Sequence, residues 1–248
     1  MTIKSNNMRK YLWIVLALPV VLGSCHRFWG KRVRGNGNVR TEERSIHNFK
    51  NVDVSGATNV YVSQGKEFSV KIEGDDNLLP YIEVSQDGDQ IRIRTRPGFN
   101  LEPTGDMKVY VTAPVYNNID VSGSCDIIGQ MKIINPEDLE MHVSGSGDIK
   151  MEVDAPSLKA RVSGAGSIDL KGQTKDVELD LTGAGHAHCY ELQAENTKVD
   201  ISGAGSAEVF ASVKLDASVS GAGNVSYKGN ATDVSQHVSG AGSVSKAN

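Results

Sequence analysis

Two histidines in the sequence are spaced so that they could bind a metal ion. His186 and His188 are separated by one residue, so their imidazoles lie on the same side of an extended strand. The repeat pattern described below places Asp169 and Glu208 beside His188 on neighbouring strands. Imidazole nitrogens and carboxylate oxygens are ligands that zinc accepts. These four residues form a candidate metal site, and the alternative is a solvated polar face without metal.

Short Ser-Gly-Ala-Gly segments recur along the chain and resemble fragments of nucleotide-binding or serine-enzyme motifs. A catalytic serine needs one activated hydroxyl with a base in reach, whereas these hydroxyls are many and equivalent. Glycine instead allows the positive φ and close backbone approach that tight turns require. We therefore interpret the segments as structural turns and predict no catalytic residue and no cofactor.

Glycan binding or cleavage is a further option. Some proteins built from stacked β-coils cleave polysaccharides with paired carboxylates, but these enzymes extend long loops from their coils to make a cleft, and fold alone does not define function. The short repeat of this chain leaves no room for such loops. Phe99, within residues 96–100, is expected on an exposed loop and is the best single candidate for contacting a sugar or protein ligand.

The first 24 residues predict a lipoprotein signal peptide. Three positive residues precede an apolar run over residues 11–22, which is shorter than a permanent membrane-spanning helix. Residues 22–25 resemble a lipobox, the processing site of bacterial lipoproteins, with Cys25 as the lipid attachment residue. The alternative is an ordinary signal peptide that happens to contain a cysteine.

A basic tether is expected to follow over residues 25–34. Acyl chains on Cys25 would hold the protein at a membrane surface, and Lys31, Arg32 and Arg34 would assist at anionic lipid. We therefore expect an outer-membrane lipoprotein of the cell envelope, with its orientation toward the periplasm or the exterior left open. The net charge of −4, without a basic stripe, argues against nucleic acid as a partner.

The chain from residue 116 to 248 is a sequence repeat. The turn signature begins at Ser122, Ser144, Ser163, Thr182, Ser202, Ser220 and Ser239, which gives intervals of 22, 19, 19, 20, 18 and 19 residues. A period near 20 residues is typical of a solenoid, in which each repeat buries its apolar face against its neighbours. The expected fold is all-β, a right-handed parallel β-helix with two main strands in each coil.

One row of charged residues supports the register of this solenoid. The residue four positions before each turn serine or threonine alternates in sign between successive repeats: Glu140, Lys159, Glu178, Lys198 and Asp216. Opposite charges on adjacent strands attract one another, so this alternation is expected when the coils stack directly.

Residues 35–115 predict a second β region, with the first coil around Ser55 and an inserted set of antiparallel strands. Alternating strands are separated by turn residues, including a hairpin signal at residues 86–89, and residues 76–82 suggest one helical turn. Cys125 and Cys189, the two cysteines other than Cys25, fall three coils apart in this arrangement. A separation of roughly 14 Å at strand spacing is too long for a disulfide, so both are expected to be unpaired.

The ordered motifs together resemble one protein family. They are the opening at residues 37–44, the Val-Asp-Val-Ser-Gly-Ala stretch at Val52, residues 76–82, residues 109–114 and the Ser-Gly-Ala-Gly array. This combination is similar to the "Putative auto-transporter adhesin, head GIN domain" family of Gram-negative envelope lipoproteins. The resemblance implies a right-handed β-helix and an exported, often lipidated protein, and it carries no catalytic motif.

The leading hypothesis is a non-enzymatic, lipid-anchored adhesin or envelope scaffold that binds a glycan or protein ligand. A glycan-active enzyme and a metal-binding envelope sensor are the alternatives. The last repeat ends without an evident cap, and open strand edges invite pairing, so end-to-end self-association is also predicted.

Overall fold

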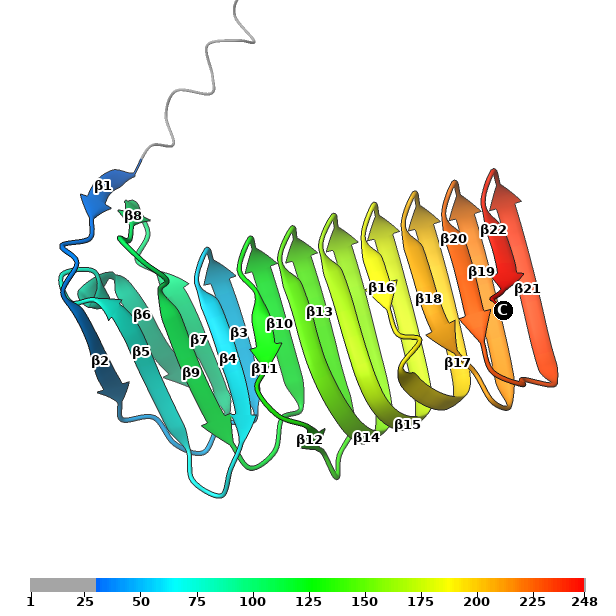
Figure 1. The fold of residues 1–248 in the computed structure, drawn as a ribbon, viewed down its shortest axis with the longest axis horizontal. Coiled ribbons are helices and arrows are strands. Elements are labelled where there is room, and N and C mark those ends of the chain that lie inside the picture. Colours follow the sequence, from blue (N-terminus) through cyan, green and yellow to red (C-terminus); the bar gives the residue numbers. More distant parts are fainter. Residues whose placement is uncertain (1–29, 248) are drawn as a thin grey trace, which may run out of the picture.

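A computed structural model describes residues 30–247 and shows an elongated β-solenoid (Figure 1). The predicted signal peptide, Cys25 and the first part of the predicted tether lie outside the described residues. From Asn118 onward, the strands of successive coils pair in parallel, which confirms the predicted fold class. None of the helical structure within residues 30–247 is long and apolar enough to cross a membrane.

Each coil presents two outer faces that meet at the glycine turn. We call the strands before each turn the first face and the strands after it the second face. On the first face lie β10 (Asn118–Gly123), β13 (Leu139–Gly145), β17 (Leu192–Gly203), β19 (Lys214–Gly221) and β21 (Asp233–Gly240). On the second face lie β11 (Ile127–Gly129), β12 (Ile133–Ile134), β16 (His186–His188), β18 (Ser206–Phe210), β20 (Asn224–Lys228) and β22 (Ser243–Lys246). The long strands β14 (Asp148–Gly164) and β15 (Ser167–Gly183) cover both faces.

At the edge of the coil opposite the glycine turn, the chain continues as a strand where a turn is expected from the sequence. Ala155 and Pro156, which the sequence places in a loose turn, lie within the continuous strand β14. Ladder pairing between β14 and β15 continues on both sides of Pro156, from Asp148 to Gly164. Proline lacks an N–H to donate, so only its own position interrupts the ladder.

The core is a set of apolar columns that run along the solenoid axis. Val162, Leu181 and Ile201 stack on one another and are buried, as are Ile168 and Ala187 on the other side of the coil. Each coil therefore buries its apolar side chains mainly against the coils before and after it.

The glycine turns are required by both conformation and space. The first glycine of each turn has a positive φ, for example +131° at Gly164 and +105° at Gly183. A Cβ on Gly183 would lie 2.7 Å from the carbonyl oxygen of Gly164 in the preceding coil. The turn backbones are thus stacked too closely for a side chain at the glycine positions, which confirms the structural interpretation of the repeated segment.

The N-terminal region closes one end of the solenoid (Figure 1). The first coil, β3 (Asn51–Gly56) and β4 (Asn59–Gln64), stacks directly on β10 and β11. The inserted strands lie on its other side: β5 (Ser69–Asp75), β6 (Ile82–Asp87), β7 (Gln90–Thr95) and β9 (Lys108–Ala113). A short 3-10 helix, η2 (Leu79–Tyr81), supplies the predicted helical turn and buries Leu79.

The insertion differs from the prediction because it is only partly antiparallel. β6–β7, β5–β9 and the pair of β2 (Val39–Arg44) with β5 are antiparallel. However, β7 and β9 pair in parallel with β3 and β4, so they form one more coil. The hairpin connecting β6 to β7 reverses the chain, and this reversal lets β7 run in the direction of β3.

The end of the expected tether is part of the fold. β1 (Lys31–Arg34) pairs in parallel with β8 (Phe99–Glu102), and Val33 packs against the core. Phe99 therefore starts a strand instead of lying on a loop, and its ring centroid is 4.6 Å from that of Tyr81. Packing against Tyr81 leaves Phe99 half-buried, which restricts how much of the ring a ligand can reach.

The C-terminal coil is more polar than the coils before it. By register, Gln236 takes the place of buried Ala217, and Lys246 takes the place of Tyr227. Val234 and Val238 remain 37% and 41% exposed at this end. The coil thus combines exposed apolar residues, which favour association, with polar residues at inward positions, which oppose it.

Candidate functional site

The first face of the solenoid carries three straight columns of side chains across its coils. The charge column contains Glu140, Lys159, Glu178, Lys198 and Asp216. A second column, two residues later in each strand, contains His142, Arg161, Asp180, Asp200 and Ser218. The hydroxyl column, at the turn position, contains Ser144, Ser163, Thr182, Ser202 and Ser220.

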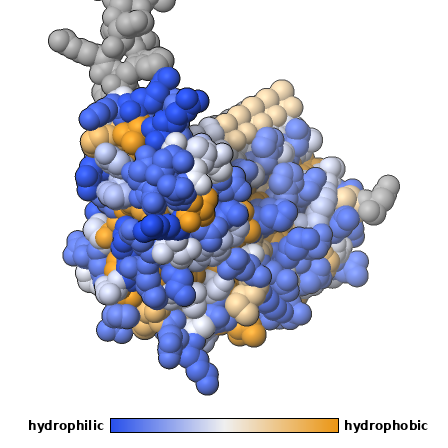
Figure 2. Space-filling model, turned by 60° about the vertical axis from the view of Figure 1, so that its left-hand side comes forward, coloured by the Kyte–Doolittle hydropathy of each residue, from blue (hydrophilic) through white to orange (hydrophobic). Residues whose placement is uncertain are grey.

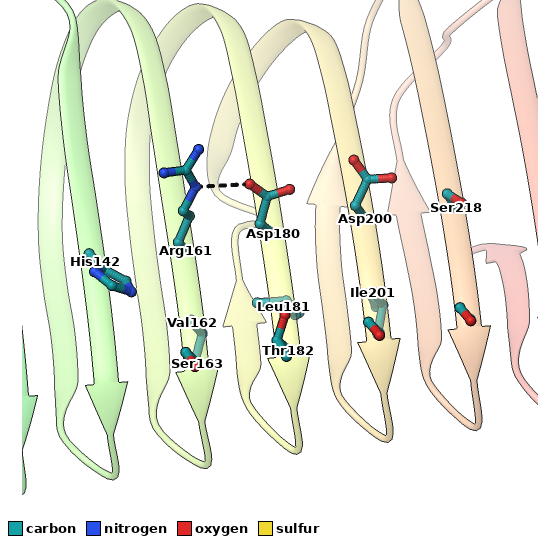
Figure 3. A pocket seen from close by; sticks show the side chains of 12 residues that line it. His142, Arg161, Val162, Ser163, Asp180, Leu181, Thr182, Asp200, Ile201 and Ser218 are labelled. Atoms are coloured by element: carbon teal, nitrogen blue, oxygen red, sulfur yellow. Dashed lines mark hydrogen bonds and ion pairs between the residues drawn. The ribbon is translucent and has the colours of Figure 1, made fainter.

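An open groove of about 450 Å³ runs along this face between the second column and the hydroxyl column. Figure 3 shows that the side chains of His142, Arg161, Asp180 and Asp200 follow one another across successive strands. In a parallel solenoid, equivalent residues repeat at roughly 4.8 Å, so the groove presents one polar side chain of each column per coil at regular intervals.

Most charges on the first face are neutralised by a neighbour in the next coil. Lys159 and Lys198 each place Nζ 2.8 Å from a carboxylate oxygen of Glu178. Arg161 Nε lies 3.1 Å from Asp180, and Lys198 also lies 3.0 Å from Asp200. The alternation of charge seen in the sequence is thus realised as ion pairs across the strands.

These ion pairs set the protonation states on the first face. Hydrogen bonds from Lys159 and Lys198 lower the pKa of Glu178 to about 2, and Glu178 in turn raises the pKa of Lys198. Both groups therefore stay charged at neutral pH. A carboxylate held in this way is a poor proton donor, so this part of the face is not arranged for acid–base catalysis.

Asp120 differs from the other carboxyl groups of this face. Burial raises its pKa, and the neighbouring carboxylate of Asp53 adds to the effect, while His142 at 3.9 Å opposes it. A raised carboxyl pKa is one property of a general acid. Asp120 is therefore the residue on which the alternative hypothesis of a glycan-cleaving enzyme would depend.

Three carboxylates on the first face come close enough to share a cation. Oxygen atoms of Glu178, Asp180 and Asp200 lie within 4.8 Å of one another. The same oxygens are already engaged by Lys159, Lys198 and Arg161. A metal ion would have to displace these cations, so we interpret the cluster as part of the ion-pair network.

The predicted histidine site lies on the second face, and the structure confirms its register. His186 pairs with Ser167 and Ser206, and His188 pairs with Asp169 and Glu208. The two imidazole rings are exposed, with centroids 6.2 Å apart and planes inclined by 18°. His186 Nδ1 lies 2.7 Å from Ser206 Oγ, and His188 Nδ1 lies 3.2 Å from a Glu208 oxygen.

The two carboxylates of this candidate site are already engaged. Glu208 accepts from His188, and Asp169 lies 3.3 Å from Lys150 Nζ. Among the described residues, the set of three close ligand atoms includes neither histidine. Metal binding by His186, His188, Asp169 and Glu208 therefore stays a prediction.

The cysteines of the described region are unpaired, as predicted. Cys125 and Cys189 are both buried and free. Burial raises the pKa of the Cys125 thiol to about 11 and that of Cys189 to about 12, so both remain protonated. Protonated buried thiols are poor nucleophiles and poor metal ligands, and both residues act as small core side chains.

The second column was the part of the site that the sequence interpretation missed. His142, Arg161, Asp180 and Asp200 are separated by the same intervals as the charge column, so an alignment of the repeats contains them. These residues form a candidate site because they line a groove together with the hydroxyl column. The intervals between residues in the sequence do not reveal a groove.

Fold and surface together define a β-solenoid with long, regularly repeated polar faces. Comparison with protein families gives a match over residues 48–231 to the family "Putative auto-transporter adhesin, head GIN domain", and the chain belongs to this family. This finding confirms the resemblance drawn from the sequence motifs. A comparison with curated proteins gave no match.

Several crystal structures share this fold. An adhesin-like protein from Bacteroides fragilis aligns with a TM-score of 0.74 and 21% identity, covering 87% of this chain and all of the other. A protein from Parabacteroides distasonis described as lipid-binding gives 0.74 and 22%, covering 88% of this chain and all of its own. A further adhesin-like protein, from Parabacteroides merdae, gives 0.69 and 22% with the same coverage. At these identities the similarity establishes the fold alone.

Proposed function

We propose that this chain is a lipid-anchored protein of the bacterial cell envelope that acts by binding, as an adhesin or an envelope scaffold, and not by catalysis. The observation that supports this proposal is the first-face groove, in which polar groups repeat across the coils and most charges are held in ion pairs. Such a surface binds an extended partner through many weak contacts. Family membership supports the adhesin assignment.

The short coils add to this proposal. Repeat intervals of 18 to 22 residues keep the connections between strands short, so the coils carry no long loops that could enclose a substrate. Figure 2 shows the N-terminal end, where polar side chains cover most of the surface and apolar ones are scattered among them. Rigid faces of this kind suit recognition of a partner at a cell surface.

Membrane attachment and exposure are tested together by protease treatment of intact cells. With the anchor intact, we expect the protein in the membrane fraction, and Cys25→Ser should release it to the soluble fraction. Loss of the protein from protease-treated cells would place the solenoid outside and favour adhesion. Protection would favour a periplasmic scaffold. A membrane-bound Cys25→Ser variant would contradict lipid anchoring.

Adhesion itself is tested by comparing attachment of cells that carry or lack the gene for this chain. We expect weaker attachment without the protein and recovery when it is restored. The double variant Asp180→Asn and Asp200→Asn changes the first-face groove while leaving the inward columns intact, so cells carrying it should also attach more weakly. Equal attachment by cells with and without the protein would exclude the adhesin role.

Metal binding is a second candidate function, supported by the orientation of the histidines. Glu208 holds His188 at Nδ1 and Ser206 holds His186 at Nδ1, which is how metal-binding histidines are commonly fixed by a neighbouring group. Titration with zinc, followed by calorimetry, should show binding that is lost in His188→Asn. His237→Asn, a change far from this pair, serves as the control. Absence of heat up to about millimolar zinc would remove this candidate.

A further inference from the structure

A second groove runs along the solenoid edge opposite the glycine turns, where the chain passes from the second face of one coil to the first face of the next. We call it the edge groove. It is shallow, encloses about 630 Å³, and crosses several coils. Its lining includes Asp154, Gln173, Lys175, Gln193, Glu195 and Phe210.

Polar side chains form a row across the edge groove. Asp154 pairs with Gln173 in the next coil, and Gln173 pairs with Gln193 in the coil after that. On the other side of Asp154, the paired residue of the preceding coil is Ile134, an apolar side chain that is 62% exposed. At roughly 4.8 Å per strand, the three polar residues span about 10 Å along the solenoid axis.

These polar groups differ from those of the first face because most of them have no partner in the protein. Within residues 30–247, the side-chain amides of Gln173 and Gln193 make no hydrogen bond, and Lys175 and Glu195 form no ion pair. One carboxylate oxygen of Asp154 lies 2.7 Å from Lys132 Nζ, whereas Oδ1 is buried without a hydrogen-bond partner. A buried acceptor of this kind gains free energy when a donor reaches it.

The chemistry of the edge groove favours a hydroxyl-rich ligand. An amide side chain both donates and accepts hydrogen bonds, and so does each hydroxyl group of a sugar. The half-buried ring of Phe210 lines the same groove and offers an apolar surface to the C–H side of a sugar ring. The positive charge of Lys175 cancels the negative charge of Glu195, and that of Lys132 cancels that of Asp154. The groove therefore carries little net charge and is not suited to a strongly anionic polymer.

We propose that the edge groove binds an uncharged oligosaccharide, with Gln173 and Gln193 hydrogen-bonded to its hydroxyl groups and Phe210 packed against a sugar ring. This inference rests on the proposed binding function and adds to it a second binding site with its ligand class. The first-face groove then acts as a separate surface, because its side chains are already paired with one another.

The test is an NMR titration of the isotope-labelled protein with four neutral tetrasaccharides. These are cellotetraose, maltotetraose, mannotetraose and chitotetraose. We expect saturable shifts of the side-chain amide signals of Gln173 and Gln193 with at least one of these sugars. The double variant Gln173→Ala and Gln193→Ala should weaken binding at least tenfold. Gln236→Ala, which removes an exposed amide at the C-terminal coil, should bind as the unchanged protein does.

Two results would overturn the inference. One is the absence of shifts with all four sugars up to about 10 mM, well beyond millimolar affinity. The other is sugar binding that the double variant leaves unchanged. Because both amides are exposed, the double variant is expected to fold, and an unaltered melting temperature checks this. Phe210→Leu, which keeps an apolar side chain, should also weaken sugar binding.

Failure of the groove and failure of adhesion give different results. Suppose that cells carrying Gln173→Ala and Gln193→Ala attach as well as cells with the unchanged protein. The edge groove is then not the adhesive site, although the adhesin role itself stands. If the purified protein binds a tetrasaccharide while cells lacking it attach normally, the groove stands and the adhesin role fails.

Discussion

The ammonium group of Lys198 lies 2.8 Å from a carboxylate oxygen of Glu178 in the preceding coil. A second lysine, Lys159 of the coil before, approaches the same carboxylate from the other side. Glu178 therefore links three consecutive coils through their outer surface. The arrangement explains why the sign of charge alternates along this column, since two equal charges in neighbouring coils would repel each other.

Replacing Glu178 with glutamine should destabilise the solenoid by about 1 kcal/mol at neutral pH, since the ion pairs are partly exposed to solvent. The pKa of Glu178 is lowered from 4.5 to about 2, so the stabilisation is complete above pH 4.5 and is lost as the pH falls toward 2. Denaturant unfolding at pH 7 and near pH 2 checks this. Glu152→Gln, which removes an exposed carboxylate outside these ion pairs, should show a smaller loss at pH 7, and equal losses would contradict the assignment.

Gly183→Ala should destabilise the stack by about 2–5 kcal/mol. Its φ of +105° is unfavourable for alanine, and the new Cβ would lie 2.7 Å from the carbonyl oxygen of Gly164. Thermal unfolding of the variant measures this loss. Gly105→Ala is the matched control, because its Cβ would meet no atom within 4 Å, and its effect should stay within about 0.5 kcal/mol. Similar melting temperatures for the two variants would show that the turns tolerate a side chain.

Tyr116→Phe should cost about 1–3 kcal/mol, because a partly buried carbonyl oxygen loses its donor. The Tyr116 hydroxyl donates to the carbonyl oxygen of Ser63 at 2.6 Å, and its side chain is fully buried. This bond ties the connection before β10 to the end of β4. Chemical denaturation measures the change, with Tyr110→Phe as a control at a half-buried ring on the outer surface. A loss no greater than that of the control would mean that the bond contributes little.

The double variant Gln236→Val and Lys246→Val should promote end-to-end association. Both residues stand at positions that are apolar in earlier coils, and Gln236 lies between the exposed Val234 and Val238 on β21. Apolar residues there would make the open end a better surface for a second copy of this chain. Sedimentation velocity over a range of concentrations should show larger species than for the unchanged protein. Lys175→Val controls for added surface hydrophobicity, and identical profiles for all three proteins would argue against association through this end.

The repeat made most of the fold predictable from the sequence. A fixed interval with glycine at its turn defines which residues share a column, so the buried columns and the charge column follow directly from counting. The placement of Glu208 beside His188 was predicted in this way, and so was the distance that keeps Cys125 and Cys189 unpaired. Outside the repeat, counting fails, and the parallel pairing of β7 with β3 could not be found from alternating strand patterns alone.

Sequence alone thus determined the solenoid, its register and its family, because these depend on local periodicity and on contacts between adjacent repeats. The tertiary structure decided which polar groups have partners and which do not. Glu178 and Gln173 are both outward polar residues in the same pattern, yet two lysines bind the first, while the second has no hydrogen-bond partner among the described residues. The difference arises because lysine side chains of both neighbouring coils are long enough to contact Glu178, whereas no side chain within residues 30–247 forms a hydrogen bond with the amide of Gln173. Such contacts depend on three-dimensional geometry.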